Sequence, residues 1–155
     1  GTKQAEMTEF YITDDKGVKT TAVIKGTEFT IHVKVAFHDR IVAPIFAFSF
    51  KNIKGTEITG TNSMIEKAFL EPVEAGVVKE VTFKQNMSLQ GGEYLLSLGV
   101  TGYEGSEFQV YHRLYDVLNV TVVSDKDTVG FYDMNSKVEV KNAAKDKVIP
   151  YRQEA

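Results

Sequence analysis

The residues able to do chemistry in this chain are three histidines and 21 carboxylates, with no cysteine to provide a thiolate. His32 and His38 lie six residues apart on one alternating segment, which places both on one face of a strand but too far apart to share a metal ion. No pair of acids has a spacing that favours the two-carboxylate arrangement of glycoside hydrolysis. The sequence therefore predicts no catalytic residue, no metal site and no cofactor.

The motifs that mark common enzyme classes are also missing from the sequence. It contains no nucleophile elbow, no His-Glu-x-x-His pair, no phosphate-binding loop and no glycine-rich dinucleotide turn. We therefore interpret the chain as a binding module rather than an enzyme.

The most suggestive surface is a face of small residues on the predicted strands. If Phe37 and the apolar residues between Leu96 and Val100 point into a core, the residues between them share the opposite face: Ala36, His38, Ala47, Ser49, Ser97, Gly99 and Thr101. A shallow trough bordered by polar, aromatic and basic side chains suits a sugar, whose hydroxyls need hydrogen-bonding partners and whose C–H face packs on aromatic rings. The expected carbohydrate-binding residues are His38, Arg40, Ser49, Ser97, Tyr103, His112, Arg113 and Tyr115. The alternative is that the small residues simply allow another strand, loop or subunit to pack there.

Strands must position these residues, because alternation of apolar and polar residues dominates the chain. It is clearest from Phe29 to Phe37 and continues in Phe46, Phe48 and Phe50. Further strands are predicted at 10–13, 56–60, 77–84, 93–101, 115–123 and 129–140, separated by turn sequences such as Asp14-Asp15-Lys16-Gly17 and Gln90-Gly91-Gly92. About eight strands with few helices predict an all-β fold, an antiparallel sandwich of two sheets.

A short helical turn is one of two interpretations of residues 63–70. Ser63 with Glu66 three residues later forms a possible capping box, and Pro72 would stop the turn. We expect one folded domain over residues 6–141, followed by a flexible tail at 142–155 that has too little apolar content to fold.

The charge and composition limit the possible partners. The formal net charge of −3 comes from interspersed acids and bases rather than from a basic face, so we expect no nucleic-acid binding. No apolar run approaches the roughly 20 residues that cross a bilayer. Because the chain starts at Gly1 rather than at methionine, we expect it to be a piece of a longer protein.

Several motifs in order resemble one known family, the C-terminal domain of Wzt-type polysaccharide ABC transporters. The first is His38-Asp39-Arg40-Ile41-Val42-Ala43-Pro44-Ile45-Phe46-Ala47-Phe48, followed by Gly55 and Gly60-Thr61-Asn62. The second is Leu89-Gln90-Gly91-Gly92-Glu93-Tyr94-Leu95-Leu96-Ser97-Leu98-Gly99-Val100, which is similar to a hairpin of that family. Tyr115-Asp116 with Leu118 and Val120 resembles its following strand, so that the resemblance covers about residues 10–140.

The resemblance implies an immunoglobulin-like sandwich that recognises an undecaprenyl-linked glycan at the cytoplasmic face of the membrane. It also implies an ATPase domain upstream, through which the domain would contact the membrane subunit of the transporter. Such domains tend to form homodimers by exchanging a terminal strand, for which residues 130–140 are the expected segment. A structural or adhesive immunoglobulin-like module of an extracellular protein remains the alternative function.

Overall fold

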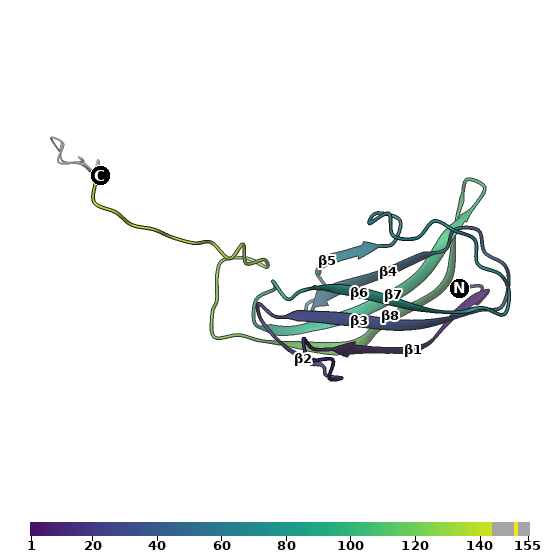
Figure 1. Cartoon of the computed structure of the whole chain (residues 1–155), viewed down its shortest axis with the longest axis horizontal. Helices are drawn as coiled ribbons and strands as arrows, with labels where there is room; N and C mark the ends of the chain where they lie inside the picture. Colours follow the sequence, from purple (N-terminus) through teal and green to yellow (C-terminus); the bar gives the residue numbers. More distant parts are fainter. Residues whose placement is uncertain (144–150, 152–155) are drawn as a thin grey trace.

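The computed structural model describes residues 1–143 and 151, and Figure 1 shows the described chain as strands and loops. No helix occurs among these residues, which confirms the all-β prediction. The strands are β1 (Ala5–Thr13), β2 (Ala22–Ile24), β3 (Glu28–Phe37), β4 (Ile45–Asn52), β5 (Glu57–Asn62), β6 (Val78–Asn86), β7 (Gly92–Glu104) and β8 (Glu107–Val123).

The strands form a sandwich of two sheets, visible as two layers in Figure 1. One sheet has three strands in the order β1-β3-β6, and the other has five in the order β2-β8-β7-β4-β5. All pairs are antiparallel except β2 with β8, which is parallel. The strands β5 and β6 are therefore edge strands of opposite sheets, and this arrangement creates the groove described below.

The core lies between the sheets, where the alternating residues of the sequence meet. Phe29 to Phe37 bury every second side chain, as the alternation predicted. From the facing sheet, Phe48 packs edge-on against Phe50, and it also contacts Phe83 of the first sheet with ring centroids 5.0 Å apart. Burying one such side chain contributes about 1.5–3 kcal/mol, so that these contacts hold the two sheets together.

Residues 63–67 form a turn and not a helix, so the helical interpretation of this segment is wrong. Asn62 rather than Ser63 caps the turn, because its side-chain oxygen accepts a hydrogen bond from the Ile65 amide at 2.8 Å. The Ser63 hydroxyl instead accepts from the Phe46 amide. Lys67 adopts a φ of 55°, a left-handed conformation that ends the turn after one winding.

The predicted strand at 129–140 is also wrong, since these residues are not part of either sheet. After β8, the chain crosses one end of the sandwich and then runs away from it in extended form, as the yellow-green trace in Figure 1 shows. We call residues 124–135 the crossover and residues 136–143 the arm. Val138 and Val140 are 85% and 89% exposed, because none of the strands in the described part of the chain lies beside them.

The strand pattern also differs from the prediction in extent. The short strand β2 was not foreseen, and β8 begins eight residues earlier than the predicted 115. Most of the predicted tail at 142–155 lies outside the described residues, so that the proposed domain boundary stays a prediction.

Candidate functional site

The outer face of the five-stranded sheet carries a row of small residues across three strands. Ser49 of β4 pairs with Gly60 of β5 on one side and with Ser97 of β7 on the other. In the next row, Ala47 pairs with Gly99. The small residues of β4 and β7 therefore share one face, as the alternation of the sequence predicted.

A bulge in β8 covers one end of this row. The pairing of β7 with β8 shifts between Leu96 and Leu98, where residues 115–117 lie opposite Ser97 alone. Asp116 takes a φ of 52° at the bulge. The Ser97 hydroxyl accepts a hydrogen bond from the Asp116 amide at 3.0 Å, which satisfies an amide that the bulge removes from the ladder.

This bulge corrects the expected role of Ser97. The side chain does lie on the outer face, but the residue is only 7% exposed because the bulge lies over it. Ser97 is thus a support for the bulge and not an open floor of a trough.

The bulge presents a cluster of polar and aromatic side chains to solvent, which we call the Tyr115 cluster: Lys51, Arg113, Tyr115 and Asp116. Tyr115 is 63% exposed. The ammonium of Lys51 lies 5.6 Å from the centre of its ring, and the guanidinium of Arg113 lies 6.0 Å away. Arg113 also donates to the Tyr115 hydroxyl at 3.4 Å, and Lys51 lies 3.8 Å from the Asp116 carboxylate.

The Tyr115 cluster combines the groups that bind sugars. Arg113 forms no ion pair with a described acid, so the guanidinium donors that do not contact the Tyr115 hydroxyl are available to a ligand. The exposed ring of Tyr115 supplies an apolar surface, and Asp116 supplies acceptors for hydroxyl groups. The sequence argument included Ser49, Arg113 and Tyr115 in the site, and the structure brings these three to one sheet face.

Two other predicted site residues lie elsewhere. His38 follows the end of β3, which belongs to the three-stranded sheet, so the prediction that it shares a face with Ser49 is wrong. Its ring lies 3.2 Å from the carboxylate of Glu6. Arg40 lies in the next loop and donates to Glu74 at 2.9 Å. The prediction failed because alternation shows which side chains of a strand share a face, but not to which sheet the strand belongs.

The remaining two predicted residues flank β7 and β8 near their hairpin. Tyr103 lies close to the hairpin tip, with its ring edge-on to Phe108 at 5.5 Å. His112 turns inward, where Nδ1 accepts a hydrogen bond from the Met7 amide at 2.9 Å. This hydrogen bond joins β8 to β1, and burial lowers the pKa of His112 even though the nearby Glu6 opposes this change.

Sequence reasoning missed Lys51 and Asp116 as members of the cluster. Lys51 could have been found, because it continues the outward alternation of Ala47 and Ser49 along β4. Asp116 could not, since its position depends on a bulge that the strand pattern does not reveal.

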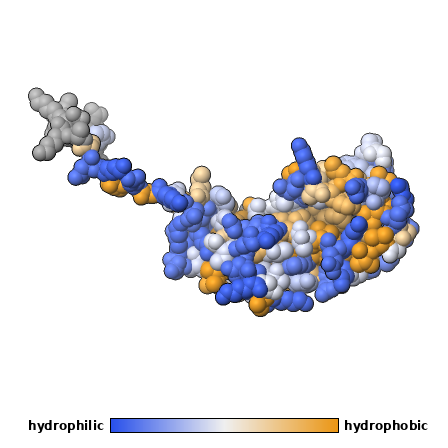
Figure 2. Space-filling model, in the orientation of Figure 1, coloured by the Kyte–Doolittle hydropathy of each residue, from blue (hydrophilic) through white to orange (hydrophobic). Residues whose placement is uncertain are grey.

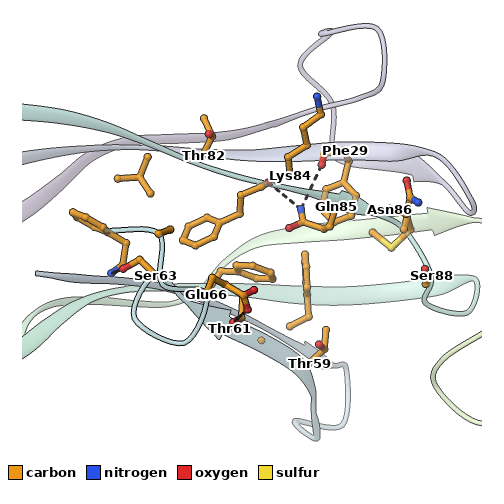
Figure 3. A pocket seen from close by; sticks show the side chains of 18 of the residues that line it. Phe29, Thr59, Thr61, Ser63, Glu66, Thr82, Lys84, Gln85, Asn86 and Ser88 are labelled. Carbon is orange, nitrogen blue, oxygen red and sulfur yellow. Dashed lines mark hydrogen bonds between the residues drawn. The ribbon is translucent and has the colours of Figure 1, made fainter. Parts of the chain in front are cut away.

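A second concave surface lies between the edge strands β5 and β6 and has a volume of about 640 Å³. We call it the phenylalanine groove, because Phe46, Phe48, Phe50, Phe69 and Phe83 line it. Figure 3 shows its polar rim, which includes Thr59, Glu66 and Lys84. On the same side of the molecule, Figure 2 shows apolar surface bordered by hydrophilic residues. Part of the groove's lining comes from residues 45–50, a run that is largely apolar on both faces in the sequence.

Comparison with known proteins assigns the family. The family model described as the Wzt C-terminal domain matches residues 1–134, which is most of the chain. The chain belongs to the Wzt C-terminal domain family. This membership supports a carbohydrate-binding role in polysaccharide export, and it makes the domain a binding rather than a catalytic unit. The match ends at Met134, so that the arm lies beyond it.

Solved structures agree with this fold assignment. The crystal structure of the C-terminal domain of Wzt superposes with a TM-score of 0.83 at 23% sequence identity, covering 91% of this chain and 86% of that one. The CARDB domain of a Pyrococcus furiosus protein is far less similar, with a TM-score of 0.41 and 16% identity over 77% of this chain and 95% of that one. No curated protein sequence matches the chain.

The described residues of this Wzt C-terminal domain form neither a metal site nor a membrane-spanning helix. No group of three or more histidine and acidic side chains there is arranged to hold a metal ion. The same part of the chain includes no helix that could cross a membrane.

Proposed function

We propose that this domain binds an undecaprenyl-linked cell-surface polysaccharide at the inner face of the cell membrane, so that an ABC transporter can export it. We place the glycan on the Tyr115 cluster. The observation that carries the proposal is the guanidinium of Arg113, which forms no ion pair with a described acid, beside the exposed ring of Tyr115 on a domain whose family supports carbohydrate binding. The family match also favours this function over an extracellular adhesive module.

The arrangement suits one sugar residue lying against the ring of Tyr115. The C–H face of a pyranose packs on an aromatic face, while Arg113 and Lys51, whose charged groups lie 6.0 Å and 5.6 Å from the ring centre, donate to its hydroxyls. Gly60 and Ser49 are small and leave room on the neighbouring surface, so that adjacent sugars of the polysaccharide can extend across β4 and β5.

The test is a binding titration with the polysaccharide isolated from the cell that makes this protein. We expect Arg113→Ala to weaken binding by about 1–3 kcal/mol, because a charge-assisted hydrogen bond is lost. Arg40→Ala is the matched control, since Arg40 is an exposed arginine of the same domain that pairs with Glu74 away from the cluster. Calorimetry that finds equal affinities for the wild type and Arg113→Ala would contradict this site.

The partners that we propose follow from the exporter function. An ATPase domain upstream would couple glycan recognition to transport and would contact the membrane subunit. A phosphate-binding loop in the sequence preceding Gly1 would support this, and a secretion signal there would argue against it.

We further propose that the domain is a homodimer in which each arm adds a strand to the partner. The arm alternates Ser136, Val138 and Val140 with charged residues, a pattern typical of a half-buried strand. Among the described residues the arm has no neighbouring strand, while the edge strands β5 and β6 flank the open phenylalanine groove. Pairing an arm with such an edge would satisfy backbone groups on both.

Light scattering at tens of micromolar tests the dimer. We expect the wild type to have the mass of two chains. The double variant Val138→Asp and Val140→Asp should be monomeric, because charges cannot enter the apolar groove. Val129→Asp is the matched control, since Val129 is 95% exposed but precedes the arm. A monomeric wild type would refute the exchange.

A further inference from the structure

The crossover is held to the sandwich by a cluster of charges around the buried Asp133 and not by apolar packing. Val129, Phe131, Tyr132 and Met134 of this segment are all at least 53% exposed, so little hydrophobic burial fixes its path. Asp133, in contrast, is buried.

Asp133 sits between two ammonium groups. Its Oδ2 lies 3.0 Å from the Nζ of Lys25 and 3.0 Å from the Nζ of Lys126. Its Oδ1 accepts a hydrogen bond from the Asn135 amide at 2.7 Å. The Asn135 amide and then the two lysines hold the pKa of Asp133 well below its usual value, so the carboxylate stays charged near neutral pH.

Lys25 is the buried centre of this cluster. Its side chain is 9% exposed, and its ammonium has three partners: Asp133, the side-chain oxygen of Gln90 at 2.8 Å and the carbonyl oxygen of Lys126 at 3.0 Å. An ammonium has three N–H donors, so all of them are satisfied. The cluster thereby joins the turn between β2 and β3, the loop before β7, and both ends of the crossover.

Backbone contacts at the same place fix the direction of the chain. The Asp133 amide donates to the carbonyl oxygen of Ser88 at 2.9 Å, and Tyr132 forms an isolated bridge with Leu89. Tyr132 also lines the phenylalanine groove. The arm begins immediately after these contacts, beside the mouth of the groove.

We propose that Lys25, Lys126 and Asp133 form a latch that sets the direction in which the arm leaves the sandwich, and so positions it for a second copy of this chain. The latter step rests on the dimer proposed above. A fixed crossover reduces the conformational freedom that the arm loses when it docks, and this strengthens the dimer without adding a contact to the interface.

The variant that tests the latch is Asp133→Asn, which keeps the shape of the side chain but removes the charge between the two lysines. Asp125→Asn is the matched control, because Asp125 is an exposed acid of the same crossover that forms no ion pair with a described residue. Both variants are made in the intact chain.

Arm direction is measured as the distance between spin labels at Lys16→Cys and Lys137→Cys, with labelled protein diluted into unlabelled protein; Lys137 is exposed and alternates with the valines of the arm. The chain has no cysteine of its own, so only these two sites are labelled. We expect a narrow distance distribution in the wild type and in Asp125→Asn, and a broad one in Asp133→Asn. A broad distribution in the wild type, or a narrow one in Asp133→Asn, would overturn the latch.

Dimer strength is measured separately by light scattering over a dilution series. We expect Asp133→Asn to raise the dimer dissociation constant by about tenfold or more, and Asp125→Asn to leave it unchanged. An unchanged constant in Asp133→Asn, despite a broad distance distribution, would overturn the positioning role. A monomeric wild type whose narrow distribution broadens in Asp133→Asn would refute the dimer but leave the latch standing.

Discussion

Replacing Ser97 by alanine removes the hydroxyl that supports the β8 bulge. The Asp116 amide then loses its acceptor at 3.0 Å while its left-handed backbone conformation remains. An unsatisfied amide costs about 1–3 kcal/mol, and the lower end applies here because Asp116 is exposed enough for water to replace part of the bond. We therefore expect a loss of about 1 kcal/mol in the free energy of unfolding, or roughly 2–4 °C in Tm.

The same change should weaken glycan binding by about tenfold, because the bulge that presents Tyr115 and Arg113 becomes less ordered. Urea denaturation measures the stability, and calorimetric titration measures the affinity. Ser106→Ala is the control, since Ser106 is an exposed serine of the turn between β7 and β8 whose hydroxyl has no hydrogen-bonding partner among the described residues. If Ser97→Ala matches Ser106→Ala in both measurements, the support assigned to Ser97 is refuted.

Two further predictions concern pH. Because the pKa of Asp133 is lowered, its contribution to stability is present above the ordinary value of 3.8 and is lost as the pH falls below it. In urea denaturation, the difference in the free energy of unfolding between the wild type and Asp133→Asn should therefore narrow below about pH 4. A gap that is constant from pH 7 to pH 3 would contradict this. Because the pKa of His112 is lowered, its contribution to stability is present above 6.5 and is lost as the pH falls below that value. An NMR titration should find that His112 becomes protonated at a lower pH than a free histidine. Protonation should also speed the hydrogen exchange of the Met7 amide. A His112 that titrates at or above 6.5 would argue against the hydrogen bond to Met7.

The alternation of apolar residues was sufficient to predict the sandwich and most of its strands. Phe29 to Phe37 are buried at every second position because a strand turns successive side chains to opposite faces. The same rule placed Ser49 and Ser97 together on the outer face. It failed for His38, because the sheet to which a strand belongs depends on long-range pairing that no local pattern records.

The parts that could not be predicted depend on local irregularity or on a missing neighbour. At the bulge, Asp116 occupies the alternating position between Leu114 and Leu118, which pack against the core. One polar residue at an inward position does not specify a bulge, so neither the burial of Ser97 nor the Tyr115 cluster followed from the sequence. Residues 129–140 have a strand-like sequence but lie in no sheet of this chain, because a strand forms only where a partner strand supplies its hydrogen bonds. The latch at Asp133 joins residues more than 100 positions apart, and no sequence spacing indicates such a contact.

The central claim, that glycan binds on the outer face of the five-stranded sheet, is tested most directly by NMR. The polysaccharide isolated from the source cell is titrated into the isotope-labelled domain, and the shifts of backbone amides are mapped onto the structure. We predict that the largest shifts fall at residues 49–51 and 113–116, and that Arg113→Ala suppresses them. Shifts confined to the three-stranded sheet or to the phenylalanine groove would contradict the claim.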